Sequence, residues 1–259
     1  MAAEIRIRSL EVSYATESGL LRPAIGPLTF DVTSAKCLAI VGPSGCGKTT
    51  LLKVLAGIIP HAIDTVTYLG DRSVAKVAYI PQSPQLLPWR TAFQNGCIGA
   101  EVHEELGRQG VLDRVEALFD KFRMRSHRDV FAPALSGGMA QRVSLIRALA
   151  SAPTVLLCDE PFSSVDFVSR FDLTSEFKRH CIKGTTTTVL VTHNIEEAIF
   201  LGDEILVLSG GPGKVIARIP VLDQDIPDRH DFVECRKTAQ FAALFQSVWN
   251  HLKAGHAAT

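Results

Sequence analysis

The sequence predicts an α/β fold built on a parallel sheet, from two observations. Three short runs are continuously apolar, as expected of strands buried on both faces: CLAIV at 37–41, VLLC at 155–158 and TVLV at 188–191. Between the runs, apolar residues show helical spacing at 50–56 and 136–151. Strands that alternate with helices are typical of parallel sheets.

Other segments predict the rest of the fold. Near the amino terminus apolar residues alternate, and the phase slips between Ser9 and Leu10, which predicts a strand with a bulge and one wet face. Helical spacing predicts a helical insertion over 101–126. Residues 203–220 predict a final hairpin around GGPG, and the tail from residue 231 predicts a helix packed on the body.

The composition is that of a folded protein without a charge bias. Its 259 residues are 46% hydrophobic and 21% charged, which excludes disordered and collagen-like classes. With 27 Lys and Arg against 27 Asp and Glu, no excess of positive charge attracts nucleic acid, so DNA or RNA binding is disfavoured. No apolar run reaches the roughly 18–20 residues that span a bilayer, and no signal peptide is recognisable, so we expect a soluble protein.

Six cysteines are scattered, with no C-x-x-C pair and no spacing that suits zinc. We expect them to be reduced thiols of a cytosolic protein, most of them in the core. They are Cys37, Cys46, Cys97, Cys158, Cys181 and Cys235.

A phosphate-binding loop follows the first buried strand and opens onto the helix at 50–56. It fits G-x-x-x-x-G-K-[ST] with Gly42, Pro43, Ser44, Gly45, Cys46, Gly47, Lys48 and Thr49, and we count Thr50 with it. Its backbone N–H groups and the helix dipole favour an anion, Lys48 is expected to reach the β- and γ-phosphates, and Thr49 to hold Mg²⁺. The alternative is a glycine-rich turn that only joins strand to helix. Cys46 inside the loop predicts sensitivity to thiol reagents, with protection by ATP.

Further polar residues follow the other two buried strands. Asp159 ends the strand at 155–158 and suits a Mg²⁺ partner, and Glu160 comes next, where a general base could orient water. His193 closely follows the strand at 188–191. Singly, such an acidic pair is often a helix cap and such a histidine is often structural. Because ligands bind beyond the carboxyl ends of parallel strands, the three strands together predict one nucleotide site.

Residues 135–142, LSGGMAQR, resemble the LSGGQ-type signature of ATP-binding cassette (ABC) ATPases, and they precede the acidic pair as in that family. The resemblance covers about residues 4–220 and includes the family's motifs in order. These are Tyr14 in the position of the adenine-stacking aromatic, the phosphate loop, Gln82 of the Q-loop, the signature, Asp159 and Glu160, Asp166 of the D-loop, and His193 as the switch histidine.

The resemblance implies a P-loop NTPase fold with a RecA-like parallel-sheet core, an antiparallel β subdomain and an inserted α-helical subdomain at about 86–153. It implies an ATPase domain over 1–222 and a helical tail over 223–259, with no separate regulatory domain.

The resemblance also implies ATP hydrolysis with Mg²⁺. Glu160 would be the base for water, and Lys48 would neutralise phosphate charge. Thr49, Asp159 and Gln82 would face the metal, and His193 would contact the γ-phosphate.

In the family the signature closes over the ATP of the opposite subunit, so the resemblance implies a homodimer. Ser136, Gly137 and Gly138 would bind phosphate there, since they precede a helix whose N–H groups are free. The alternative is that Ser136 simply caps the N-terminus of the helix. Asp166 would link the two sites, and Tyr14, otherwise the last residue of its strand, would stack on adenine.

The sequence departs from the family pattern at several places. Pro81 precedes Gln82 where Phe is frequent, Ser164 and Val165 replace Ala-Leu, and Asn194 replaces Asp. None of these removes a phosphate, metal or water ligand, so we expect active hydrolysis. The stretch before Gln82 is short and lacks a clear hairpin, which predicts a trimmed antiparallel subdomain.

The segment QSPQLLPWRTAFQN at 82–95 is apolar for a surface stretch, and its LLPW resembles the nitrate, sulfonate, taurine and pyrimidine-precursor importer branch. That branch implies two integral membrane permease subunits and a periplasmic or surface solute-binding protein as partners. The chain would then be peripheral, at the cytoplasmic face of the inner membrane. Leu87 and Trp89 are candidates to contact the permease, and packing inside the helical subdomain is equally open.

A rival function is a non-transport ABC ATPase that acts on nucleic acid or ribosomes. Such proteins usually join two cassettes or carry coiled coils and basic surfaces, and none of these features is present in the sequence. A kinase or GTPase is excluded by the signature and by the lack of an N-K-x-D motif. A catalytically weak scaffold that dimerises on nucleotide is a third possibility.

Overall fold

The computed structural model describes residues 2–16, 19–69, 76–101, 107–182, 185–222, 226–227 and 229–257. Its central sheet has six strands in the order β5-β6-β7-β3-β8-β9, all parallel except β9. Their bounds are β5 Val77–Ile80, β6 Val155–Asp159, β7 Thr187–Val191, β3 Cys37–Val41, β8 Glu204–Leu208 and β9 Val215–Pro220.

The three apolar runs lie side by side at the centre of this sheet. Every residue of β3, β6 and β7 is buried, since helices or the second sheet cover both faces. The parallel α/β fold that the sequence predicts is confirmed, and β8 and β9 form the expected hairpin.

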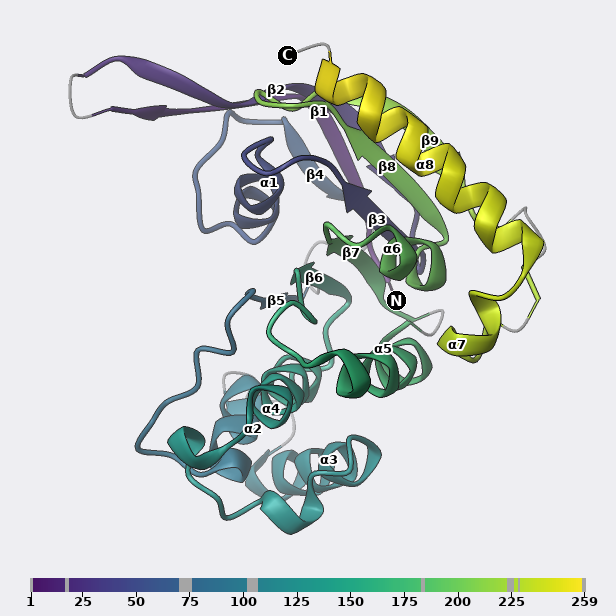
Figure 1. Cartoon of the computed structure of the whole chain (residues 1–259). Helices are drawn as coiled ribbons and strands as arrows, with labels where there is room; N and C mark the ends of the chain where they lie inside the picture. Colours follow the sequence, from purple (N-terminus) through teal and green to yellow (C-terminus); the bar gives the residue numbers. More distant parts are fainter. Residues whose placement is uncertain are drawn as a thin grey trace.

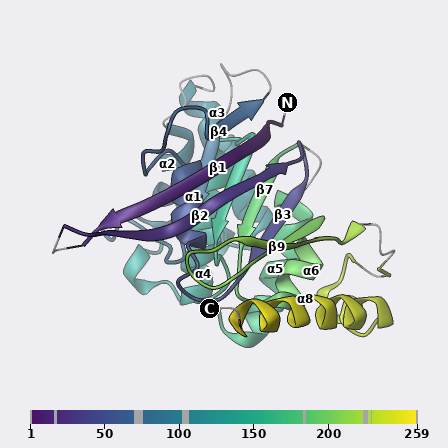
Figure 2. The same ribbon diagram turned by 90° about the horizontal axis from the view of Figure 1, so that it is seen from above.

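A second, antiparallel sheet has the order β2-β1-β4. Its strands are β1 Glu4–Ala15, β2 Leu21–Val32 and β4 Val66–Leu69. The predicted bulge is present, because the register shifts between Ile7 and Leu10, and Ser9 adopts a φ of 48°. Figures 1 and 2 show the β1–β2 hairpin extending well beyond the body of the molecule.

The prediction of a trimmed antiparallel subdomain concerns the stretch before Gln82, of which residues 70–75 lie outside the described residues. Among the described residues between α1 and Gln82, only β4 joins this sheet, while β5 belongs to the central one. The hairpin partner of β1 is β2, which the sequence analysis did not predict. Pro23 and Pro27 interrupt its pattern, and only Leu28, Phe30 and Val32 alternate clearly inward.

Helices cover both sheets. Their bounds are α1 Lys48–Leu55, α2 Ala92–Glu101, α3 Gly107–Lys121, α4 Gly137–Ala150, α5 Phe167–Cys181, α6 Ile195–Leu201, α7 Phe232–Cys235 and α8 Ala239–Ala257, with short 3-10 turns at Arg125–His127 and Ala132–Ala134. Helices α2, α3 and α4 gather at the end of the molecule away from α1 (Figure 1). The insertion predicted over 101–126 contains α3, and residues 102–106 of it lie outside the described residues.

The tail packs against the body, as its helical pattern predicts. Helix α8 runs along β8, β9 and α6 (Figure 1), and buries Phe241, Leu244 and Val248. All six cysteines are buried thiols outside any disulfide. Among the described helices, none is both long enough and apolar enough to cross a bilayer.

Candidate functional site

The site lies along the carboxyl ends of four neighbouring strands. Gln82 follows β5, Glu160 follows β6, His193 follows β7 and Gly42 follows β3, and the sheet order places these four strands next to one another. The sheet therefore brings together groups that are far apart in the sequence, at the edge where open parallel sheets bind ligands.

The phosphate loop turns sharply between β3 and α1. Gly45 and Gly47 have φ values of 79° and 96°, in the left-handed region that favours glycine. A Cβ on Gly47 would lie 2.4 Å from the carbonyl oxygen of Ala24, so only glycine fits there. Ser44 and Gly45 are exposed at the turn. The loop is thus an open concave backbone that fits a phosphate chain.

Lys48 begins α1 beneath this loop. Its side chain is 8% exposed, and its Nζ donates to the carbonyls of Gly42 at 2.7 Å and Pro43 at 2.8 Å. At the other side of the loop, the hydroxyls of Tyr14 and Thr50 are hydrogen-bonded at 3.2 Å, so the aromatic ring at the end of β1 stands beside α1. Tyr14 is half exposed.

Cys46 bears on one prediction. Its side chain is 1% exposed and points under the loop, where a Cβ on Gly42 would lie 2.9 Å from its Sγ. Burial raises the pKa of this thiol, although Lys48 acts in the opposite direction. A buried, protonated thiol reacts slowly, so the structure argues against the predicted sensitivity to thiol reagents.

The carboxylate of Asp159 is held on both oxygens. Thr49 Oγ1 donates to Oδ1 at 3.2 Å, and the hydroxyl of Tyr79, from β5, donates to Oδ2 at 3.2 Å. Burial raises the pKa of Asp159, and these two hydrogen bonds act in the opposite direction. Hydroxyl and carboxylate oxygens suit a hard cation such as Mg²⁺, so this donor set fits the metal. Tyr79 was not predicted, because no motif marks a contact between two strands.

Glu160 lies at the centre of the site in a strained backbone conformation. Its φ is 46°, and its N–H donates to the carbonyl of Val191 at 2.9 Å. Its Oε2 lies 3.0 Å from Nδ1 of His193 and accepts from Nε2 of Gln82 at 3.3 Å. The structure therefore brings the three predicted residues Gln82, Glu160 and His193 together at one oxygen.

The signature residues lie apart from the phosphate loop, at the N-terminus of α4. Ser136 caps α4 by accepting from the N–H of Met139, and a Cβ on Gly137 would lie 2.9 Å from the carbonyl of Ser164. Gly138 packs near Val165. In Figure 1, α4 lies with α2 and α3, away from α1 and the phosphate loop. The predicted residues 136–138 thus pack on the segment before Asp166.

Asp166 caps α5. Its carboxylate accepts from the N–H of Ser169 at 3.0 Å, and this hydrogen bond lowers the pKa of Asp166. Phe167 and Val168, the first two residues of α5, are exposed. The signature therefore packs against the loop that leads into Asp166 and α5.

A contact that was not predicted supports the phosphate loop from below. The β8–β9 turn GGPG, which the sequence marks only as a hairpin turn, packs on the loop. The N–H of Gly213 donates to the carbonyl of Cys46 at 3.2 Å, and a Cβ on Gly213 would lie 2.4 Å from that oxygen. The close approach requires glycine at this position.

The segment after Gln82 presents Trp89 to solvent with 70% of its surface exposed, while Leu87 is half buried. The fully buried Asn95 holds the turn, since its side chain bonds the backbone of Leu87, Arg90 and Thr91. Packing of Trp89 inside the helical region is therefore wrong.

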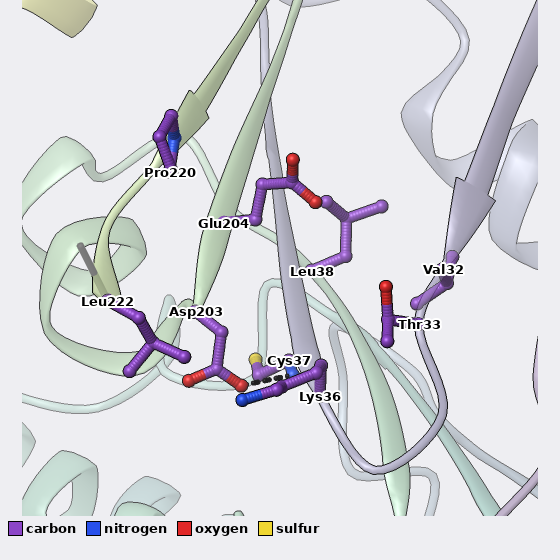
Figure 3. A pocket seen from close by; sticks show the side chains of 9 residues that line it. All are labelled: Val32, Thr33, Lys36, Cys37, Leu38, Asp203, Glu204, Pro220 and Leu222. Atoms are coloured by element: carbon purple, nitrogen blue, oxygen red, sulfur yellow. Dashed lines mark hydrogen bonds between the residues drawn. The ribbon is translucent and has the colours of Figure 1, made fainter.

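A hollow of about 260 Å³ lies at the opposite edge of the sheet, at the amino ends of β3 and β8 (Figure 3). Asp203 Oδ2, in this hollow, accepts from the N–H of Cys37 at 2.8 Å. Because ligands of open parallel sheets bind at the carboxyl ends, the edge with Lys48 and Glu160 is the candidate nucleotide site.

Comparison with known proteins agrees with this geometry. The aliphatic sulfonates import ATP-binding protein of Pseudomonas syringae pv. syringae is 37% identical over 85% of this chain and 89% of its own length. The taurine import ATP-binding protein of Escherichia coli is 34% identical over 80% of this chain and 82% of its own. The aliphatic sulfonates import ATP-binding protein of Bacillus subtilis is 35% identical over 96% and 93%.

Among solved structures, an ATP-binding cassette described as a dimer in a post-hydrolysis state with ADP and phosphate matches with a TM-score of 0.72. The match has 22% identity and covers 84% of this chain and 98% of the other. It shows that the two share a fold. The family model described as ABC transporter matches residues 25–163. With its phosphate loop, acidic pair and signature in the family's order, the chain belongs to the ABC transporter family of ATP-binding proteins.

Proposed function

We propose that this chain is the ATP-hydrolysing subunit of a bacterial importer, peripheral to the cytoplasmic face of the inner membrane, with a solute of the sulfonate or taurine type. One observation supports the ATPase assignment most strongly. Gln82 and His193 both contact Oε2 of Glu160, beside the phosphate loop. The import role is supported by relatives named as sulfonate and taurine import ATP-binding proteins.

Binding of ATP starts at the phosphate loop. The backbone N–H groups of Gly45 to Lys48 face the phosphate chain, and the ammonium of Lys48 exchanges its two loop carbonyls for phosphate oxygens. Tyr14 offers its exposed ring to adenine. Thr49, Asp159 and Gln82 would hold Mg²⁺, which would neutralise charge on the phosphates.

Hydrolysis depends on Glu160. Its carboxylate takes the proton of the attacking water, with Gln82 and His193 fixing the oxygen that does so. His193 also reaches the γ-phosphate, since most of its ring is exposed. Lys48 stabilises the charge that develops on the transferred group.

We also propose that two copies of the chain sandwich ATP between the phosphate loop of one and residues 136–138 of the other. The N-terminus of α4 is exposed at Ser136 and Gly137, which suits a second phosphate contact. Asp166, on the same surface, links the two sites. The dimeric solved relatives support this arrangement.

This ATPase drives a pair of separate membrane permease subunits, which receive solute from a solute-binding protein. Trp89 is the proposed contact with the permease, because it is a large exposed aromatic on a turn that Asn95 holds rigid. Closure of the two ATPase subunits then moves the attached permease. A non-transport ATPase acting on nucleic acid or ribosomes is not favoured, because all the named import relatives align over most of this chain and its net charge is zero.

The test is purification of the chain from membranes with its bound partners, followed by ATPase measurement with a panel of solutes. Sulfonates or taurine are expected to stimulate hydrolysis, and Trp89→Ala is expected to lose the partners while keeping basal hydrolysis. Co-purification with nucleic acid or ribosomes, without membrane subunits, would contradict the import role.

A further inference from the structure

One buried carboxylate next to the site has no part in the mechanism above. Glu197 lies in the first turn of α6, four residues after His193, and is 3% exposed. Burying a carboxylate is costly unless it is paired or hydrogen-bonded. The groups around Glu197 therefore indicate what it does.

Glu197 closes a hydrogen-bonded ring around His193. Thr192 is 1% exposed, and its hydroxyl donates to Glu197 Oε2 at 2.7 Å. The same hydroxyl accepts from the N–H of Asn194 at 3.0 Å, and Asn194 Oδ1 in turn accepts from the N–H of Glu197 at 3.3 Å. The backbone of His193 lies between these two anchors, so the side chain of Glu197 fixes where His193 stands.

Arg170, one turn into α5, is a second charged residue near this region, and its contacts are with the Asp166 loop. Its Nη2 donates to the carbonyl of Val165 at 3.2 Å, directly before Asp166, and its backbone N–H donates to the carbonyl of Asp166 at 2.9 Å. Its Nε is buried and makes no hydrogen bond to the described residues. Arg170 is thus a cation attached to the Asp166 loop.

The charges that act on Glu197 are those of Arg170, His193 and Glu160. Burial raises the pKa of Glu197, while the hydrogen bond from Thr192 and the positive charge of Arg170 favour its ionised form. The negative charge of Glu160 also raises the pKa of Glu197, and His193, like Arg170, lowers it.

We propose that Glu197 is a positioning residue, which holds His193 against Glu160 through its hydrogen bond with Thr192. This inference rests on the proposed hydrolysis at Glu160. Because Glu197 acts through His193, its loss affects the hydrolytic step more than the affinity for ATP.

The test compares Glu197→Gln with Glu196→Gln in the full chain. Glutamine keeps an oxygen for the hydroxyl of Thr192 but removes the negative charge of the carboxylate. Glu196 is the matched control, because it neighbours Glu197 on the same helix and pairs with Arg236 at 2.7 Å on the outer side. We expect Glu197→Gln to lower kcat roughly tenfold with KM for ATP changed less than about twofold, and Glu196→Gln to keep both.

Two further comparisons separate positioning from folding. Thr192→Val should lower kcat more than Thr192→Ser, which retains the hydroxyl. Thr192→Val and Glu197→Gln together should lower kcat by less than the product of the two single effects, because both change the same hydrogen bond. Wild-type kcat in Glu197→Gln, or equal losses of kcat and thermal stability in Glu197→Gln and Glu196→Gln, would overturn the inference.

A second readout does not depend on activity. The ring signals of His193 in an NMR spectrum should shift in Glu197→Gln and stay in place in Glu196→Gln. If the wild-type chain does not hydrolyse ATP, the proposed function fails, and the His193 signals alone decide the inference. Unshifted signals in Glu197→Gln contradict it.

Discussion

At the scale of single residues, the site depends on a carboxylate that is held in place before any substrate reaches it. Glu160 adopts a left-handed φ of 46°, and two side chains from neighbouring strands meet at its Oε2. Strain of this kind persists only where the surroundings fix it. The hydrogen bond to Val191 and the contacts with Gln82 and His193 supply that constraint.

Cys46 gives a prediction about reactivity. Because burial raises the pKa of its thiol, little thiolate forms at neutral pH. We expect alkylation of Cys46, followed by mass spectrometry, to be far slower in the folded protein than in urea, and ATP to change the rate little. Rapid labelling of the folded protein that ATP blocks would contradict the buried placement.

Lys178 gives a prediction about pH. It donates to the carbonyl of Phe200 at the end of α6, and burial, with the charge of Arg229, lowers its pKa from 10.5 to about 7. Between these values the unfolded chain binds the extra proton, so the free energy of unfolding rises with pH across this window. Below pH 7 the cost of burying the ammonium is fully present.

Lys178→Met removes this titration. Urea unfolding between pH 7 and 9.5 should therefore show a flatter pH dependence in the variant, by up to about 1.4 kcal/mol per pH unit. Parallel curves for the two proteins would mean that Lys178 has an ordinary pKa.

At the scale of elements, the β8–β9 turn and the phosphate loop support each other. Gly213→Ala places a Cβ 2.4 Å from the carbonyl of Cys46, so one of the two segments must shift. We expect ATP to bind roughly tenfold or more weakly, measured by titration with a fluorescent ATP analogue. Gly26→Ala is the matched control, since its Cβ would lie 3.4 Å from the oxygen of Gly213 and needs no shift. Equal affinities in both variants would argue against the support.

The elements that the sequence predicts well are those whose pattern is local. The strands β3, β6 and β7 are buried throughout because both faces are covered, and α4 ends at Ala150, three residues before Pro153, as its pattern indicates. Strand β2 was not predicted from the sequence. It lies at the edge of a sheet, where a strand tolerates prolines, and Pro23 and Pro27 interrupt its pattern.

The candidate site likewise contains residues that local motifs predict and residues that they do not. Motifs locate Lys48, Asp159, Glu160 and His193, because the phosphate chemistry needs those residue types at fixed places along the chain. The bond of Tyr79 to Asp159 and the close approach of Gly213 to Cys46 depend on strand order and turn geometry, which no local pattern carries. The burial of Cys46 likewise follows from that packing.

At the scale of the whole molecule, one core joins parts that the motifs would separate. The larger apolar cluster includes residues of the helical region, one face of the central sheet, and the tail. Phe232 of α7 packs between Phe200 of α6 and Phe171 of α5, with ring centroids 4.7 and 5.3 Å away. We therefore propose that the tail over 223–259 is part of the ATPase body.

Phe232→Ala tests this integration. The side chain is 1% exposed, and its removal should lower the free energy of unfolding by about 3–5 kcal/mol in a single transition. Val233→Ala, next to it and 45% exposed, should cost less than about 0.5 kcal/mol. Equal small effects in urea unfolding would show a tail that folds apart from the body.

The central claim is that the carboxyl edge of the sheet hydrolyses ATP with Glu160 as the base. Its most direct test is the steady-state turnover of ATP by Glu160→Gln beside the wild-type chain, with Mg²⁺ and with ATP binding measured in parallel. The account predicts that the variant binds ATP, remains dimeric with it, and turns it over at least roughly 100-fold more slowly. Turnover near the wild-type rate in a variant that binds ATP normally would contradict it.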